Sequence, residues 1–431
     1  MITIERAVTN FENEPLLAPF GFKGGAMNHI WQYSVYLKTP EGKEAVGIGC
    51  QGILWSDARV FANSSPFAGC AKMYLITEYA AKQLEGQSFK NPWEAFDFLL
   101  PRTIKYAKMV TGQNDLRLTF VLNAMVGIDH ALWQLYFYTE HASGLEDLLP
   151  GDIRAALNRS YDRIGVIPLI SYGVSVDEIE KLADQGFFFF KIKIGADPDR
   201  DQDPDKMLAW DKERLFKIHS TLKDRWTPYT NTGHVLYYLD ANGRYDCVER
   251  MNELLAYAEK IGMLERIVVL EEPFSEENTC SVEDLPVMVA ADESAHSPED
   301  VRQRIRLGYK AIALKPIAKT LTVTFRMIRE AMKTGTPCFC ADLTVGPYMA
   351  EINKAIASRL DTLPGLAIPA MESNGWQNYS HWDQMKTYHS ICQGSWSELR
   401  DGCYELNKEF YQRAGGIFEP SPHYRQVALE E

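Results

Sequence analysis

The stretch FFFFKIKIG, residues 187–195, places two lysines directly after four phenylalanines. Side chains alternate along a β-strand, so Lys191 and Lys193 project from the same face. The surrounding apolar residues are typical of a strand that is buried on both faces, as in parallel sheets. Two buried ammonium groups would repel each other and lose hydration unless anions surrounded them. The stretch therefore predicts carboxylates close to both lysines.

Three further apolar runs end in such carboxylates, and a fourth ends in a lysine. The runs are VLYYLDANG (235–243), RIVVLEEPF (266–274), PVMVAADES (286–294) and YKAIALKP (309–316). Their polar ends are Asp240 and Asn242, Glu271 and Glu272, Asp292 and Glu293, and Lys315. Successive ends lie roughly 20 to 30 residues apart, which is the length of one strand and one helix. This spacing predicts a (β/α) barrel whose strand ends bring all these groups into one mouth.

A purely structural interpretation accounts for any one of these charged residues. Taken alone, each is more often a helix cap, a salt-bridge partner or a solvated loop residue than a catalytic group. Consecutive barrel strands that each end in a charge are different, because the barrel directs all these charges to one place. The pattern therefore favours a functional site over a set of independent surface charges.

The order and spacing of these motifs resemble those of a known family. KxK on one strand, DxN on the next, EEP, ADES and a lysine followed by proline resemble the enolase superfamily. Within it, they are most similar to the muconate-lactonizing-enzyme-like branch of the mandelate racemase/muconate lactonizing enzyme family. Residues 121–136, VLNAMVGIDHALWQLY, resemble the helix that leads from this family's capping domain into its barrel. The resemblance implies an α/β fold, a (β/α)7-8 TIM-like barrel with an N-terminal α+β capping domain that the C-terminal segment completes.

The resemblance also implies roles for particular residues. It implies metal ligands at Asp240, Glu271 and Asp292, acid/base residues at Lys193 and Lys315, and an electrostatic helper at Lys191. Three hard oxygen ligands suit Mg²⁺ better than zinc. The expected cofactor is therefore Mg²⁺, and the expected partner is a small-molecule carboxylate substrate.

The implied reaction starts with removal of the proton on the carbon next to the substrate carboxylate. A metal would stabilise the resulting ene-diolate, and a lysine base would need a pKa near about 7 to 8. Lys191 and the metal are expected to lower the pKa of Lys193 toward that range. Two opposed lysines are the minimum for racemisation or epimerisation, which is the reaction we expect. Dehydration of a sugar acid by β-elimination, cycloisomerisation and a catalytically silent homologue that binds metal and carboxylate are the alternatives.

Residues 1–150 are predicted to form the capping domain, an antiparallel sheet followed by helices. The sheet is expected to contain a hairpin with PEGK, residues 40–43, at its tip. Between the first strands lies GFKGGAMNH, residues 21–29, which we expect to be a mobile loop because it contains three glycines. The family resemblance connects this loop with substrate specificity. Lys23 and His29 are therefore candidates for binding a polar or anionic part of the substrate.

Helices in this domain are expected over residues 68–84, 92–100 and 118–138. Residues 151–375 are predicted to form the barrel, and residues 376–431 to return to the capping domain. The acidic insertion at 196–206 is expected to be a surface elaboration near the mouth.

The last two barrel strands add polar residues at the mouth. The strands are expected in PCFCADLT (337–344) and GLAIPAMESNG (365–375), which bring Asp342 and Glu372. Together with Asn242 and Glu293, these two residues are further candidates for substrate binding. The last two strands lack the histidine and the DxD motif of other branches of the family, so the lysine–lysine branch stays the closest resemblance.

Composition limits the classes of function. The chain has 431 residues with 46% hydrophobic composition and a net charge of −13, so a large core is expected and nucleic acid or an anionic membrane is not an expected partner. No apolar run has the length of a membrane span and no signal peptide is recognised, so we expect a cytoplasmic protein. The eight cysteines lack the spacing of a zinc site, and no disulfide is expected. The family resemblance implies a homo-oligomer.

Overall fold

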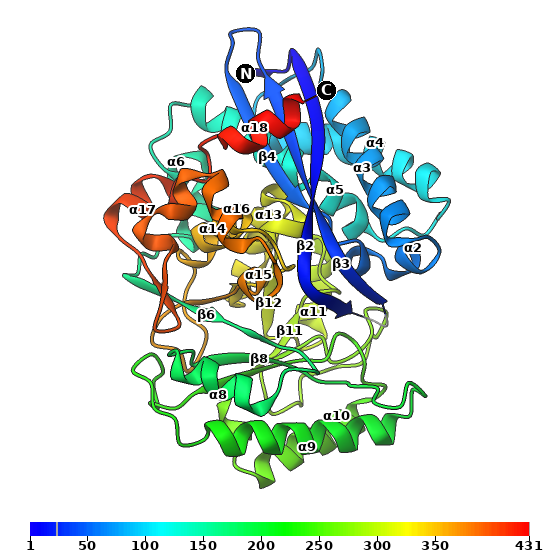
Figure 1. Cartoon of the computed structure of the whole chain (residues 1–431), viewed down its shortest axis with the longest axis vertical. Helices are drawn as coiled ribbons and strands as arrows, with labels where there is room; N and C mark the ends of the chain where they lie inside the picture. The colour runs from blue at the N-terminus through cyan, green and yellow to red at the C-terminus, as the bar shows by residue number, and fades with distance from the viewer. Residues whose placement is uncertain (23–24, 431) are drawn as a thin grey trace.

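The computed structural model describes residues 1–22 and 25–430 of the chain. An antiparallel sheet with its helices stands above a ring of parallel strands that other helices surround (Figure 1). The predicted fold, a TIM-like barrel with an N-terminal α+β capping domain, is therefore confirmed.

The capping domain begins with a three-stranded antiparallel sheet. Its strands are β2 (Arg6–Phe22), β3 (Gly25–Lys38) and β4 (Glu44–Cys50), in that order, and a small pair joins β1 (Ile2–Thr3) to β5 (Ser88–Phe89). The predicted PEGK tip lies between β3 and β4, where Gly42 has a positive φ of 84°. The predicted loop at 21–29 is wrong for the described residues, because Gly21 pairs with Ala26 as part of a long hairpin. Lys23 lies outside the described residues.

Helices cover one face of this sheet. They are α1 (Ile53–Ser56), α2 (Ala58–Ala62), α3 (Pro66–Lys82), α4 (Pro92–Thr111) and α5 (Leu118–Thr139), followed by the short α6 (Leu145–Leu148) and α7 (Gly151–Ala156). α4 is longer than the predicted 92–100, because buried Leu99 and Thr103 continue one packed face across Pro101. α5 is buried along most of its length and packs directly on β4. A Cβ on Gly47 would lie 1.8 Å from the carbonyl oxygen of Gly127, so only glycines permit this contact.

The barrel consists of parallel strands in chain order. They are β6 (Arg163–Ile167), β7 (Leu169–Ile170), β8 (Phe189–Lys193), β9 (Leu236–Asp240), β10 (Ile267–Glu271), β11 (Val289–Ala291), β12 (Ala311–Leu314), β13 (Cys338–Cys340) and β14 (Ala370–Glu372). Only Pro168 separates β6 from β7. β6 pairs with β14, and β7 pairs with β8, so this interrupted strand closes the ring.

Helices and short turns follow the barrel strands and connect each strand to the next. They are α8 (Val176–Asp184), α9 (Pro204–Leu222), α10 (Val248–Lys260), η1 (Leu264–Arg266), α11 (Pro298–Arg306), α12 (Pro316–Lys319), α13 (Leu321–Met332) and α14 (Pro347–Ala357). A capping box between Ser175 and Glu178 starts α8, which explains why this helix begins where it does. Most residues of the acidic insertion precede α9 as an irregular segment, and Asp203 caps that helix.

The C-terminal segment contacts both parts of the fold. It comprises α15 (Gly375–Asn378), α16 (Trp382–Met385), η2 (Lys386–Tyr388), η3 (Ser390–Gln393), η4 (Ser395–Ser397), β15 (Leu399–Arg400), β16 (Cys403–Glu405), α17 (Lys408–Gln412), η5 (Ala414–Gly416) and α18 (Pro422–Leu429). β16 pairs with β6 of the barrel, whereas α18 lies across β2 and β3 of the capping sheet (Figure 1). The limits 1–150, 151–375 and 376–431 for the three parts stay a prediction.

Aromatic side chains fill the barrel interior beneath the mouth. Phe189, Tyr238 and Phe339 come from three different strands and are fully or almost fully buried. The rings of Tyr238 and Phe339 meet edge to face with their centroids 5.5 Å apart. This packed floor leaves the strand ends above it as the place for polar groups. None of the helices in the described ranges combines the length and the apolar character that a membrane crossing requires.

Candidate active site

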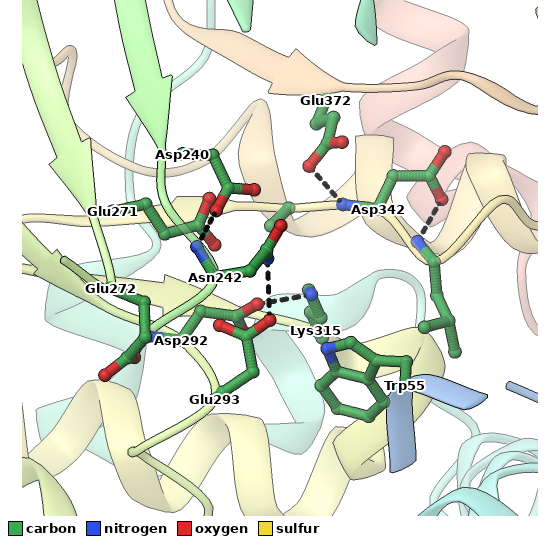
Figure 2. Close-up of polar contacts among 12 residues, drawn as sticks. Trp55, Asp240, Asn242, Glu271, Glu272, Asp292, Glu293, Lys315, Asp342 and Glu372 are labelled. Carbon is green, nitrogen blue, oxygen red and sulfur yellow. Dashed lines mark hydrogen bonds and ion pairs between the residues drawn. The ribbon is translucent and has the colours of Figure 1, made fainter. Parts of the chain in front are cut away.

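The barrel mouth gathers the side chains that the motifs predicted, and Figure 2 shows Lys315 among the acids and Asn242. They come from the ends of the strands or from the residues just after them, and nearly all are buried. A small cavity of about 70 Å³ is lined by most of these groups, but Glu271, Glu272 and Asp292 are not part of its lining. Charged residues line its barrel side, and capping-domain residues such as Trp55 line the opposite side. The strand ends and the capping domain therefore enclose one shared space.

Lys191 lies at the centre of the carboxylates. Its Nζ is 2.6 Å from Glu271 Oε2 and 3.0 Å from both Asp240 Oδ2 and Glu372 Oε2. Burial alone would lower the pKa of Lys191, but these three carboxylates together outweigh burial and raise it well above its usual value. The neighbouring Lys193 therefore does not lower the pKa of Lys191. The fold brings more negative charge to Lys191 than the residues next to it in the sequence indicate.

Lys193 projects from the same face of β8 and is less deeply buried than Lys191. Its Nζ lies 2.5 Å from Asp240 Oδ2 and donates to Asn242 Oδ1 at 2.6 Å. Burial alone would raise the pKa of the Asp240 carboxyl, but Lys191 and Lys193 together hold it well below its usual range. Asp240 is thus ionised at neutral pH, and two lysines balance its charge.

Two further lysines hold Asp292. Lys315 Nζ lies 2.5 Å from Asp292 Oδ2, and Lys319 Nζ donates to Asp292 Oδ1 at 3.0 Å and to its backbone oxygen at 2.8 Å. Burial alone would lower the pKa of Lys315, but Asp292 and nearby glutamates raise it above its usual value. Lys319 was not predicted from the sequence. The available signal was its spacing, because residues four apart in a helix lie on the same side.

A carboxylate cluster suited to a metal lies beside these lysines. One ligand oxygen each from Glu271, Asp292 and Glu293 lies within 4.8 Å of the others. Glu271 Oε1 and Glu293 Oε2 are buried without a hydrogen-bond partner, so both oxygens are available to a cation. Hard, buried oxygen donors of this kind fit Mg²⁺. Asp240, the third predicted ligand, is not among these three residues, and Lys191 and Lys193 contact its carboxylate.

Glu272, the second acid of EEP, has a different position. Its Oε2 accepts hydrogen bonds from the backbone N–H of Asp292 at 2.8 Å and of Ser294 at 3.1 Å. Burial and the charge of Glu293 raise the pKa of Glu272 to about 8. Glu272 also adopts a positive φ of 39°. These contacts fix the turn after β11, which carries Asp292 toward the cluster.

Glu372 and Asp342, the acids predicted at the last two barrel strands, form part of the cavity wall. Glu372 Oε2 accepts from the backbone N–H of Asp342 at 2.9 Å in addition to pairing with Lys191. Asp342 Oδ2 accepts from the backbone N–H of Asn374 at 2.8 Å. Burial and the nearby Glu372 raise the pKa of Asp342 to about 7. Both acids line the cavity, although most of their oxygens already have partners.

The other candidates for substrate binding separate into two groups. Asn242 Nδ2 donates to Glu293 Oε1 at 2.9 Å, and both residues line the cavity. His29 is exposed on β3 and does not line the cavity, although Met27 and Ile30 on either side of it do. Lys23 is outside the described residues. Two capping-domain residues that line the cavity, Gln51 and Trp55, were not predicted.

Solved structures share this fold. A mandelate racemase/muconate lactonizing protein from Herpetosiphon aurantiacus has a TM-score of 0.65 at 16% identity, over 94% of this chain and 96% of its own. A dipeptide epimerase from Cytophaga hutchinsonii, complexed with Mg and the dipeptide D-Ala-L-Val, has a TM-score of 0.63 at 17% identity, over 88% and 89%. An N-succinyl Arg/Lys racemase from Bacillus cereus has a TM-score of 0.62 at 14% identity, over 88% and 89%. Identities this low establish the fold and no more.

Sequence comparisons supply the family. Comparison with curated proteins gives no match. The family model described as enolase C-terminal domain-like matches residues 175–409, which include every lysine and acid of the barrel mouth named above. Because this segment is more than half of the chain, the protein belongs to the enolase C-terminal domain-like family of the enolase superfamily, as its motifs indicated.

Proposed function

We propose that the protein is a Mg²⁺-dependent enzyme that removes the α-proton of a small carboxylate through an ene-diolate and racemises or epimerises that substrate. The observation that carries this proposal is the position of two lysines. Lys193, from β8, and Lys315, just after β12, line the same cavity. In the closed ring, three strands separate β8 from β12 in either direction, so the two lysines approach from opposite sides.

Opposed lysines can invert the configuration at one carbon. One amine takes the α-proton from one face of the substrate, and the ammonium on the other side returns a proton to the opposite face. The reverse reaction uses the same groups with exchanged roles. Lys191 is unsuited to either role, because three carboxylates enclose its ammonium and raise its pKa. We assign Lys191 to balancing the charge of the carboxylates.

The residues that would hold Mg²⁺ are Glu271 and Asp292, with Asp240 as the predicted third ligand and Glu293 as a further carboxylate within reach. A cation held there would supply positive charge that stabilises the ionised substrate carboxylate, and it would lower the lysine pKa by competing with the lysines for their acids. Lys315 otherwise stays protonated, because Asp292 and nearby glutamates raise its pKa against the effect of burial. In that state it can return a proton and cannot take one.

The experiment is α-proton exchange in D₂O, followed by NMR with Mg²⁺ across a panel of amino-acid derivatives, hydroxy acids and sugar acids. We expect Lys193→Ala and Lys315→Ala each to slow racemisation by about 10²- to 10⁴-fold, because each lacks one acid/base group. Each variant should still exchange the α-proton of one enantiomer, and the enantiomer should differ between the two variants. Racemisation at the parent rate in either variant would refute the two-lysine mechanism.

The same experiment separates the alternatives. Dehydration of a sugar acid converts the substrate into a 2-keto acid, whereas racemisation leaves its composition unchanged. A silent homologue would bind Mg²⁺ and carboxylates without exchange of any compound in the panel. We also propose, from the family resemblance, that the protein is a cytoplasmic homo-oligomer, and light scattering would measure its mass in solution.

A further inference from the structure

A second and larger space lies beside the cavity of the barrel mouth. It is a cleft of about 880 Å³ between the capping domain, which contributes Asp57 and Arg117, and the loops that follow β8, β9, β10 and β11. Asn242 and Glu293 line both the cleft and the cavity, so the two spaces share part of a wall. The proposed mechanism takes place in the cavity and gives the cleft no role.

Acidic side chains dominate the lining of the cleft. Nine acids and three arginines are among its described lining residues. Two of the arginines lie against acids of the same cleft, since Arg117 pairs with Glu276 and Arg59 pairs with two others. The acids stay in excess even where Glu272 carries a proton. A cleft with this charge attracts cations and repels anions.

Two buried oxygens distinguish this cleft from an ordinary acidic surface. Glu272 and Glu293 line it and are 0% and 1% exposed, yet Glu272 Oε1 and Glu293 Oε2 have no hydrogen-bond partner. A buried carboxylate oxygen without a partner is costly, and a hard cation satisfies it. Glu293 also belongs to the metal cluster, whose other acids, Glu271 and Asp292, line neither space. The cleft therefore leads to the cluster through Glu293.

The cleft is also wide enough for a hydrated cation. Mg²⁺ gives up its water ligands reluctantly, so it approaches a site with several of them still bound. The cleft, at about 880 Å³, has room for many water molecules, whereas the cavity, at about 70 Å³, is lined on its capping-domain side by residues such as Ile30 and Leu54. An approach through the cleft keeps the cation among polar groups until it reaches Glu293.

We propose that this cleft is the entrance through which a divalent cation reaches the cluster of Glu271, Asp292 and Glu293, separately from the cavity. Asp197 is partly exposed and Glu277 is exposed, so these two acids supply charge that a cation from solution meets early. The inference rests on the proposed metal cluster and is independent of the reaction proposed for the cavity. A cation that uses this entrance can bind and leave while the cavity is occupied.

The test measures how fast Mn²⁺, which prefers the same oxygen ligands as Mg²⁺, binds to the protein. Stopped-flow mixing with a fluorescent indicator of free Mn²⁺ gives the rate constants of association and dissociation. In the double variant Asp197→Asn/Glu277→Gln, association should slow by about three- to tenfold at low salt, and added salt should shrink this difference.

The matched control removes the same charge from the other end of the barrel. Asp224 and Asp361 are exposed and precede β9 and β14, so they lie at the end opposite the mouth. Asp224→Asn/Asp361→Asn should bind Mn²⁺ at the parent rate.

A further variant distinguishes an entrance from a binding site. Ser275 is exposed and lines the cleft, so Ser275→Trp narrows the cleft without a change of charge. An obstacle in an entrance slows entry and exit alike. Association and dissociation should therefore both slow by about threefold or more, while the Kd stays within about twofold of the parent value.

The outcomes separate the entrance from the rest of the site. Association at the parent rate in either cleft variant, or equal slowing in the control, overturns the entrance and leaves the proposed reaction standing. Absence of Mn²⁺ binding to the parent overturns the metal cluster and the entrance together.

Discussion

Lys319 offers a direct test of how the site balances its charge. It is fully buried on α12 and donates both to the side chain and to the backbone oxygen of Asp292. Lys319→Met keeps a similar length and apolar stem while it removes the ammonium group. Among the described residues, the carboxylate of Asp292 then keeps one close cation, Lys315, at 2.5 Å.

The magnitude follows from these contacts. Removing one partner of a buried ion pair costs about 3 to 5 kcal/mol, because the remaining charge stays buried without compensation. Since Lys315 still pairs with Asp292, we expect the low end, a loss of about 3 kcal/mol in the free energy of unfolding without Mg²⁺. The same loss of positive charge should make the site bind Mg²⁺ more tightly, by about tenfold for each 1.4 kcal/mol of relieved repulsion.

The assay is urea unfolding at a series of Mg²⁺ concentrations, with calorimetry for the Mg²⁺ affinity. A cation that binds the folded state stabilises it by about 2.7 kcal/mol at one hundred times its Kd. Because the variant binds Mg²⁺ more tightly, the difference in stability between parent and variant should shrink as Mg²⁺ is added. A constant difference at all Mg²⁺ concentrations would mean that Lys319 does not share its charge with the metal site.

Lys354→Met is the matched control. Lys354 is also buried, and its Nζ lies 2.7 Å from Glu351 Oε1 and 2.8 Å from the oxygen of Trp396, away from the cavity. Lys354→Met should therefore lower the free energy of unfolding equally with and without Mg²⁺. The reasoning about Lys319 is refuted if Lys319→Met costs less than about 1 kcal/mol without Mg²⁺, or if both variants respond to Mg²⁺ alike.

Two further predictions concern the framework of the site. Asp211, on α9, accepts hydrogen bonds from the N–H of Gly195 at 2.6 Å and from Tyr245 Oη at 2.7 Å. Burial raises the pKa of Asp211 to about 6, so its contribution to stability should fall by about 3 kcal/mol as pH rises from about 4 through 6. Asp211→Asn should flatten the pH dependence of the urea midpoint over that window, and a variant with the same pH dependence as the parent would contradict this. Gly47→Ala should lower the free energy of unfolding by about 3 kcal/mol or more, because its Cβ would lie 1.8 Å from the oxygen of Gly127. Gly173→Ala should be neutral in the same measurement, because the space around Gly173 is open.

The barrel and its charged mouth could be predicted because local patterns decide them. A strand that is buried on both faces forces Lys191 and Lys193 to one side, and the repeat of apolar runs brings Asp240, Glu271 and Asp292 to the same end of the sheet. Alternation and strand-to-strand spacing are visible in a single sequence. This is why the residues of the mouth were found without the structure.

The features that were missed depend on contacts between distant segments. Three glycines near residue 24 predicted a loop, but pairing of Gly21 with Ala26 extends the hairpin instead. Gln51 follows an apolar run and would be a typical surface residue, but in the fold its side chain is buried and lines the cavity between the capping domain and the barrel. The pKa of Lys191 is likewise raised by acids from three other strands. Their effect on this pKa is larger than the opposite effects of burial and of the neighbouring lysine.

The two sides of the cavity differ in charge, which separates the groups proposed for proton transfer from the wall that faces them. The barrel side holds the charges, and the described capping-domain residues on the other side are uncharged. Arg117 joins the two sides at one point, since it donates to the oxygen of Trp55 at 3.2 Å and to the oxygen of Glu293 at 3.3 Å. The ring of Trp55 in turn lies 4.6 Å from Lys315 Nζ. Substitutions on the capping-domain side should therefore change the shape and polarity of one wall of the cavity, while the lysines and acids of the barrel side keep their positions.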